Sequence, residues 1–93
     1  MSERAEGEFT ILNQLGLHAR AAAQLVQVAN RYHGDVLLRA DEEEEVNGKS
    51  IMGVLMLAAA CGQVLKVSCV GPGAADCLRE IGELIANKFG EER

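Results

Sequence analysis

Aromatic side chains are scarce in this chain of 93 residues, which has one Tyr, two Phe and no Trp. The core must therefore be aliphatic, and the surface lacks the aromatic platforms on which nucleic-acid bases stack. The formal net charge of −5 points the same way, because a surface that binds nucleic acid needs an excess of Lys and Arg. We therefore expect no binding to nucleic acid.

The chain also lacks a long apolar run. The longest run covers residues 54–61, which is far too short to cross a bilayer, and residues 1–7 lack the apolar stretch of a signal peptide. The cysteines, Cys61, Cys69 and Cys77, are odd in number and lack the spacing of a metal site or a disulfide framework. Reduced thiols fit this pattern, so we expect a cytoplasmic protein with no membrane insertion and no metal site.

What is present suffices for one compact domain. We expect this domain to span residues 1–93, with its core in about residues 8–90 and a polar tail at residues 1–7. Apolar spacing and turn residues predict strands at residues 8–13, 35–40, near 46 and at 63–70. They also predict a helix from residue 19 that closes before Gly34, a short helix capped by Ser50 and ended by Gly62, and a helix at about residues 74–89.

The predicted element order is strand, helix, strand, strand, helix, strand, helix. One sheet with a single apolar face and three helices packed on that face would bury all of the predicted apolar stripes. Placing the last strand between the first and second strands gives a split βαβ arrangement and an antiparallel sheet. The predicted fold is therefore α+β, an open-faced sandwich of four antiparallel strands and three helices.

His18 stands where the first helix is expected to begin. The N–H groups of Ala19, Arg20 and Ala21 would be free there, and the positive end of the helix dipole favours an anion. Arg20 adds a positive charge two residues after the imidazole. A nucleophilic ring nitrogen beside a phosphate-shaped set of donors indicates a histidine that carries or holds a phosphoryl group.

Two motifs extend this interpretation. The sequence Gly-Leu-His-Ala-Arg occupies residues 16–20, and Asn-Gly-Lys-Ser-Ile-Met-Gly-Val occupies residues 47–54. With both motifs at this separation and in this element order, the chain resembles the HPr phosphocarrier proteins of the bacterial phosphotransferase system, including their nitrogen-branch relatives. The resemblance covers about residues 8–90, and it implies the HPr-like fold. The chain departs from the family pattern at Ala21, where Pro usually follows the arginine.

The resemblance also implies roles for individual residues. His18 would take a phosphoryl group on Nδ1 from enzyme I and pass it to an enzyme IIA domain, with Arg20 beside the phosphohistidine and no cofactor. Ser50 would be a regulatory site that an HPr kinase/phosphorylase phosphorylates, and a transcriptional regulator would be a further partner. The apolar surface that such carriers present to partners would comprise Ile51, Met52 and Leu55. We expect a monomer.

Two other functions fit parts of the sequence. The chain could be a regulatory interaction module in which phosphorylation of Ser50 controls binding and phosphoryl transfer is secondary. It could also be a small enzyme with His18 as general base, although no carboxylate, second His or Ser near His18 in sequence would orient the ring. The pairing of His18 with Arg20 favours the carrier.

Overall fold

The structure, a computed structural model, describes residues 3–93 of the chain. Its elements are β1 (Arg4–Thr10), α1 (Ala19–Ala29), β2 (Asp35–Ala40), β3 (Val46–Asn47), α2 (Ile51–Met56), β4 (Val64–Val70), α3 (Ala74–Ala86) and a 3₁₀ turn, η1 (Lys88–Gly90). The order of strands and helices is the one that the sequence predicts.

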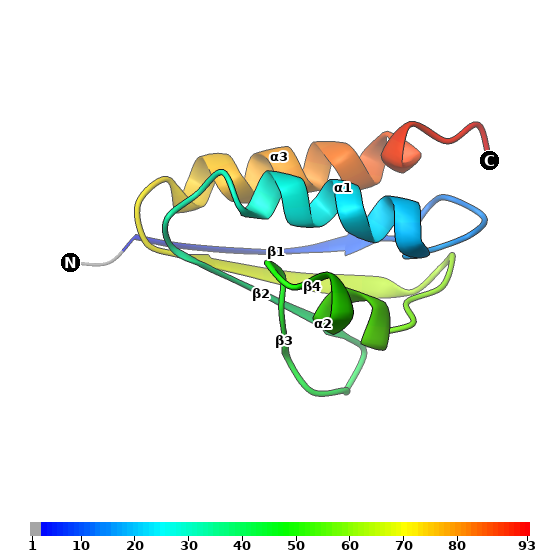
Figure 1. Cartoon of the computed structure of the whole chain (residues 1–93), viewed down its shortest axis with the longest axis horizontal. Helices are drawn as coiled ribbons and strands as arrows, with labels where there is room; N and C mark the ends of the chain where they lie inside the picture. The colour runs from blue at the N-terminus through cyan, green and yellow to red at the C-terminus, as the bar shows by residue number, and fades with distance from the viewer. Residues whose placement is uncertain (1–2) are drawn as a thin grey trace.

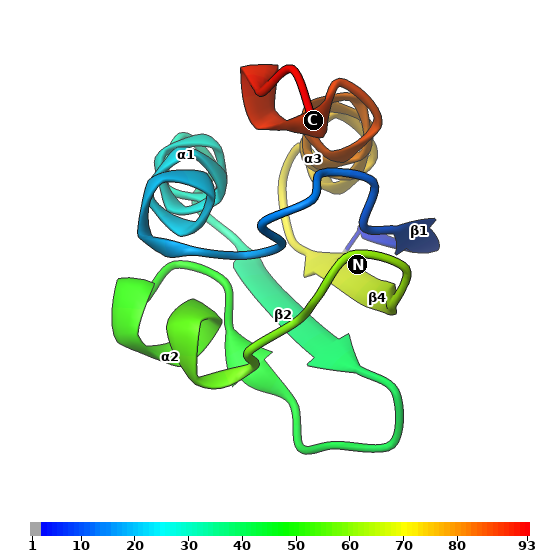
Figure 2. The same ribbon diagram turned by 90° about the vertical axis from the view of Figure 1, so that its right-hand side faces the viewer.

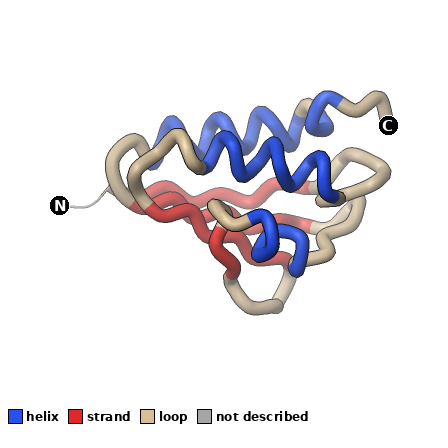
Figure 3. The backbone as a smooth tube through the Cα atoms, viewed as in Figure 1, coloured by secondary structure: helices blue, strands red, loops and turns tan. Residues whose placement is uncertain are grey.

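The four strands form one antiparallel sheet in the order β1-β4-β2-β3. As predicted, the last strand lies between the first two. All three helices lie on one side of this sheet, with α1 and α3 side by side and α2 beside α1 (Figure 1, Figure 3). The view along the helices shows the opposite face of the sheet left open (Figure 2). The predicted α+β fold is thus confirmed.

The prediction for the first strand was wrong at both ends. β1 begins at Arg4 and ends at Thr10, so residues 4–7 are part of the sheet rather than a polar tail. Residues 1–2 of that predicted tail lie outside the described residues. The first half of the strand escaped prediction because its outward positions are charged or polar, while its inward positions are Ala5 and Gly7, which carry little apolar signal.

The first helix is shorter than its apolar pattern predicted. α1 ends at Ala29, and the side chain of Asn30 donates to the free carbonyl of Val26 at 2.9 Å. Gly34, which the sequence predicts as the C′ residue just after this helix, serves a different purpose. A Cβ at Gly34 would lie 1.9 Å from the carbonyl oxygen of Val70, so glycine is needed where the chain passes close to the end of β4.

The other two helices are also shorter than predicted. α2 ends at Met56 rather than at residue 62, because Ala58 adopts a left-handed conformation with φ 48°. α3 ends at Ala86 rather than at residue 89, and the chain continues into η1.

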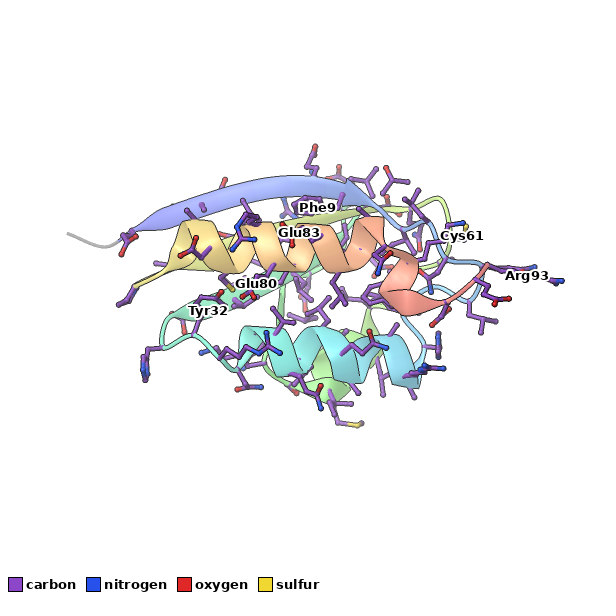
Figure 4. The ribbon with its side chains drawn as sticks, turned by 90° about the horizontal axis from the view of Figure 1, so that it is seen from above. Phe9, Tyr32, Cys61, Glu80, Glu83 and Arg93 are labelled. Atoms are coloured by element: carbon purple, nitrogen blue, oxygen red, sulfur yellow. The ribbon has the colours of Figure 1, made fainter. Side chains whose placement is uncertain are left out.

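The core is mainly aliphatic, as the sequence predicts, with Phe89 as a fully buried aromatic side chain among the described residues. The helix stripe predicted for α1 is buried, and β4 alternates toward the same core; the contributing side chains are Ala22, Leu25, Val26, Ala29, Leu65, Val67 and Cys69. At the far end of α1 from His18, the Tyr32 hydroxyl donates to Glu80 of α3, and Figure 4 shows these two side chains together. Among residues 3–93, no helix is both long and apolar enough to cross a bilayer.

Candidate functional site

The loop between β1 and α1 is tied to the rest of the fold just before His18. Gly16 has φ 66°, and a Cβ there would lie 2.4 Å from the carbonyl oxygen of Ala59, so only glycine fits. The next residue, Leu17, is buried and donates its N–H to the same carbonyl at 2.9 Å. The backbone just before His18 is therefore held in two ways, by the buried side chain of Leu17 and by a hydrogen bond from its N–H.

His18 is the N-cap of α1, as the sequence predicts. Its carbonyl accepts the first helical bond, from Ala22 N–H at 2.8 Å, but its side chain makes no capping bond. Within residues 3–93, the N–H groups of Ala19, Arg20 and Ala21 donate to no protein acceptor. These three donors and the helix dipole make the start of α1 attractive to an anion.

The ring of His18 instead contacts a residue far along the chain. Its Nε2 lies 2.5 Å from Oε2 of Glu91, and the other oxygen of that carboxylate accepts a bond of 3.0 Å from Nδ2 of Asn13. Asn13 is completely buried and also donates to the Gly16 carbonyl at 2.8 Å. A carboxylate is thereby fixed between the loop that precedes α1 and the imidazole itself.

The hydrogen bond from His18 and the one from Asn13 lower the pKa of the Glu91 carboxyl below its ordinary value. Glu91 is thus ionised at neutral pH, and a carboxylate only accepts hydrogen bonds. The proton of this contact accordingly resides on Nε2 of His18. The second ring nitrogen, Nδ1, makes no hydrogen bond within residues 3–93.

Arg20 is exposed on the first turn of α1 and forms no ion pair among residues 3–93. Its side chain lines a shallow depression of about 450 Å³ together with Leu15, Glu91 and Arg93. Figure 4 shows Arg93 at this end of the molecule. A free guanidinium beside an imidazole and three free N–H groups suits a phosphate-like anion.

Ser50 is the N-cap of α2, and its hydroxyl accepts a bond of 3.2 Å from the N–H of Gly53. The residue is half-buried, and its neighbour Lys49 is fixed by a bond from its ammonium to the Tyr32 carbonyl. This second predicted site therefore has its own local support. No hydrogen bond or ion pair joins Ser50 to His18 among residues 3–93.

The predicted contact surface lies mainly on α2. Ile51 and Met52 are 44% and 68% exposed, whereas Leu55 is half-buried against the core. Met56, which the sequence analysis did not include, is 76% exposed. We call Ile51, Met52 and Met56 the α2 patch. Large apolar side chains at such exposure are typical of a contact surface.

Sequence reasoning missed Glu91 and Asn13. Glu91 joins the site only through contacts that cross 73 and 78 residues of chain, so no local spacing could reveal it or the bond that Asn13 makes to it. The one available signal was Gly90, which marks a turn that redirects the chain after α3. The described residues contain no group of three or more His, Cys, Asp or Glu side chains placed to hold a metal ion.

Comparison with known proteins gives a consistent result. Residues 5–87 match the family described as PTS HPr component phosphorylation site. The phosphocarrier protein HPr of Pseudomonas aeruginosa is 49% identical over 84 residues, which cover 90% of this chain and 93% of that protein. The one from Xylella fastidiosa is 42% identical over 87 residues, covering 94% and 97%.

A solved structure agrees with these relatives. The crystal structure of HPr-C-His from Thermoanaerobacter tengcongensis superimposes with a TM-score of 0.90 at 37% sequence identity. The match covers 96% of this chain and 99% of that one.

Proposed function

Because this chain belongs to the HPr family of phosphocarrier proteins, we propose that His18 is the residue on which it carries the phosphoryl group, through Nδ1. The protein is an HPr phosphocarrier of the phosphotransferase system, a phosphoryl carrier rather than a classical enzyme. Family membership implies partners within that system.

The observation that carries this proposal is the state of the His18 ring. Nε2 is engaged by Glu91, so Nδ1 keeps the free electron pair that a nucleophile needs. The ring stands at the start of α1, where three unpaired N–H groups can receive the phosphoryl oxygens. No other nitrogen nucleophile in the described residues combines these two features.

Arg20 would stabilise negative charge during transfer. Its guanidinium has no competing ion pair within residues 3–93 and is free to approach the phosphoryl group. A carrier must also release what it accepts, so charge stabilisation in the transition state is more useful than tight binding of the product. We propose enzyme I as the donor and an enzyme IIA domain as the acceptor.

A second candidate function is regulation through Ser50. It is favoured by one observation: the capping hydroxyl stands directly before the exposed side chains of the α2 patch. Phosphorylation there would place a charge of about −1.5 to −2 beside an apolar contact surface. In this reading a kinase/phosphorylase modifies Ser50 and a transcriptional regulator senses the result.

Intact mass spectrometry tests the carrier directly. The protein is mixed with enzyme I and phosphoenolpyruvate, and we expect the mass of one phosphoryl group, labile in acid and stable in base. His18→Ala should abolish the gain. His33→Ala is the matched control, because His33 is the only other histidine and is exposed. A His18→Ala protein that still gains an acid-labile group would refute the assignment, and loss of the group in His33→Ala would redirect it.

A further inference from the structure

The segment that follows α3 turns through three consecutive residues of left-handed backbone. Lys88, Phe89 and Gly90 have φ values of 56°, 55° and 77°. Such a conformation is unfavourable for Lys and Phe and persists only where the surroundings enforce it. Here the enforcement comes from Phe89, whose side chain is 1% exposed in the core.

The turn determines the position of Glu91. Directly after Gly90, the Glu91 side chain reaches His18 and Asn13 and is only 12% exposed. Glu92 and Arg93, the next residues, are exposed and make no ion pair or side-chain hydrogen bond within residues 3–93. The left-handed backbone and the buried Phe89 side chain therefore place the Glu91 carboxylate, which makes two hydrogen bonds, against the imidazole of His18.

We propose that Glu91 is a positioning residue for phosphoryl transfer. It holds the His18 ring with the proton on Nε2, and its negative charge balances the positive charge of the ring once Nδ1 is phosphorylated. The inference rests on the proposed role of His18. Asn13 completes the arrangement, because its amide holds the second carboxylate oxygen and prevents the side chain from rotating away. The role parallels that of a carboxylate behind a catalytic imidazole.

The chemistry balances without an added acid or base. The electron pair on Nδ1 forms the new N–P bond while the bond between phosphorus and the donor atom breaks, and the electron pair of that broken bond returns to the donor. The proton on Nε2 stays in place, so the phosphorylated ring has the character of an imidazolium. The Glu91 carboxylate, 2.5 Å from Nε2, is its counterion.

The same counterion keeps the carried group reactive. A phosphoryl group leaves imidazole most readily when the other ring nitrogen is protonated, because the leaving group is then neutral. Glu91 favours that protonated form, since a nearby opposite charge stabilises it. Glu91 should therefore speed both acceptance and release, which is what a reversible carrier requires.

The experiment compares Glu91→Gln with Glu92→Gln, a neighbouring carboxylate that does not reach the ring. In wild type and Glu92→Gln, nitrogen NMR of His18 should show the proton on Nε2; in Glu91→Gln the Nδ1-protonated form should appear. We expect Glu91→Gln to accept phosphate from enzyme I about tenfold more slowly, equivalent to about 1.4 kcal/mol. The phosphorylated variant should also hydrolyse about fivefold more slowly at pH 8.

Slower hydrolysis distinguishes the proposal from a merely structural role, because loosening the site would leave hydrolysis unchanged or speed it. Glu91→Asp should recover part of the transfer rate, and melting temperatures monitor the fold. Wild-type tautomer populations and rates in Glu91→Gln would overturn the role of Glu91 while leaving His18 as the carrier. A wild-type protein that acquires no phosphoryl group on His18 would instead overturn the proposed function itself.

Discussion

His18 and Ser50 occupy the same position, the N-cap, at the starts of two helices, and each is proposed here as a site for a phosphoryl group. Ser50 uses its side chain to cap α2, whereas the His18 side chain caps nothing and is held by Glu91. The helices explain the difference: α1 has 11 residues and five buried side chains, while α2 has six residues and one. A helix with ample burial leaves its N-cap side chain free for chemistry.

The largest expected effect comes from removing the charge that distinguishes the His18 end. Arg20→Ala should slow phosphoryl transfer from enzyme I by about 30-fold to 1000-fold, since a positioned charge of this kind contributes on the order of 2 to 4 kcal/mol in the transition state. Rapid-quench kinetics with phosphorylated enzyme I measures it. Arg31→Ala, which lies two residues beyond the end of α1 and is paired with Glu80, is the control. An unchanged rate would remove Arg20 from the mechanism.

A charge at the other N-cap should act on binding rather than on folding. Ser50→Asp places a carboxylate at the start of α2, which the helix dipole tolerates, but a partner covering the α2 patch must desolvate it. We expect about tenfold weaker binding to enzyme I, or about 1.4 kcal/mol, with little change in melting temperature. Titration calorimetry of wild type, Ser50→Asp and Ser50→Asn decides the point. Equal affinities would leave Ser50 as a cap only.

A third comparison removes the capping side chain from α2 and adds one to α1. Ser50→Ala should lower the free energy of unfolding by about 1 kcal/mol, because the Gly53 N–H loses its acceptor. His18→Ser should be more stable than His18→Ala by about 0.5 to 1 kcal/mol, because Ser provides the capping oxygen that His18 withholds. Urea denaturation of the four proteins checks both halves. Equal stability of the two His18 variants would show that α1 has no need of a cap.

The smallest effect concerns the residue that departs from the family pattern. Ala21→Pro fixes φ in the first turn of α1 and removes an N–H that has no acceptor in the part of the chain that the structure describes. Because Ala21 is fully buried, the new ring must fit the core; if it does, the gain in stability is about 0.4 to 1 kcal/mol with transfer nearly unchanged. Thermal unfolding and transfer kinetics measure the two outcomes. Large loss of transfer in a stable variant would identify the Ala21 N–H as a phosphate donor.

Much of the fold was predictable because its determinants are local. Apolar periodicity and turn residues located all three helices and all four strands, and one sheet with one covered face then implied β4 between β1 and β2. The errors lie where close contact or backbone strain overrides periodicity. Gly34 looks like a helix terminator in sequence, but glycine is needed there because the chain passes close to β4, which no sequence pattern encodes.

The candidate site divides in the same way. The relation of His18 to Arg20 and the capping by Ser50 follow from neighbouring residues, so the sequence indicates them directly. The Glu91 contact depends on a left-handed turn and on the buried side chain of Phe89, both consequences of the complete fold. Met56 was overlooked because exposure on a short helix is decided by what packs beside it.

The contact between His18 and Glu91 spans 73 residues, and this separation has a consequence for synthesis of the protein. At about 5 to 20 residues per second, a ribosome completes Glu91 roughly 4 to 15 seconds after His18. During that interval a growing chain contains the imidazole but not the carboxylate that orients it. The His18 ring therefore reaches its final arrangement only when nearly the whole domain has been made and folded.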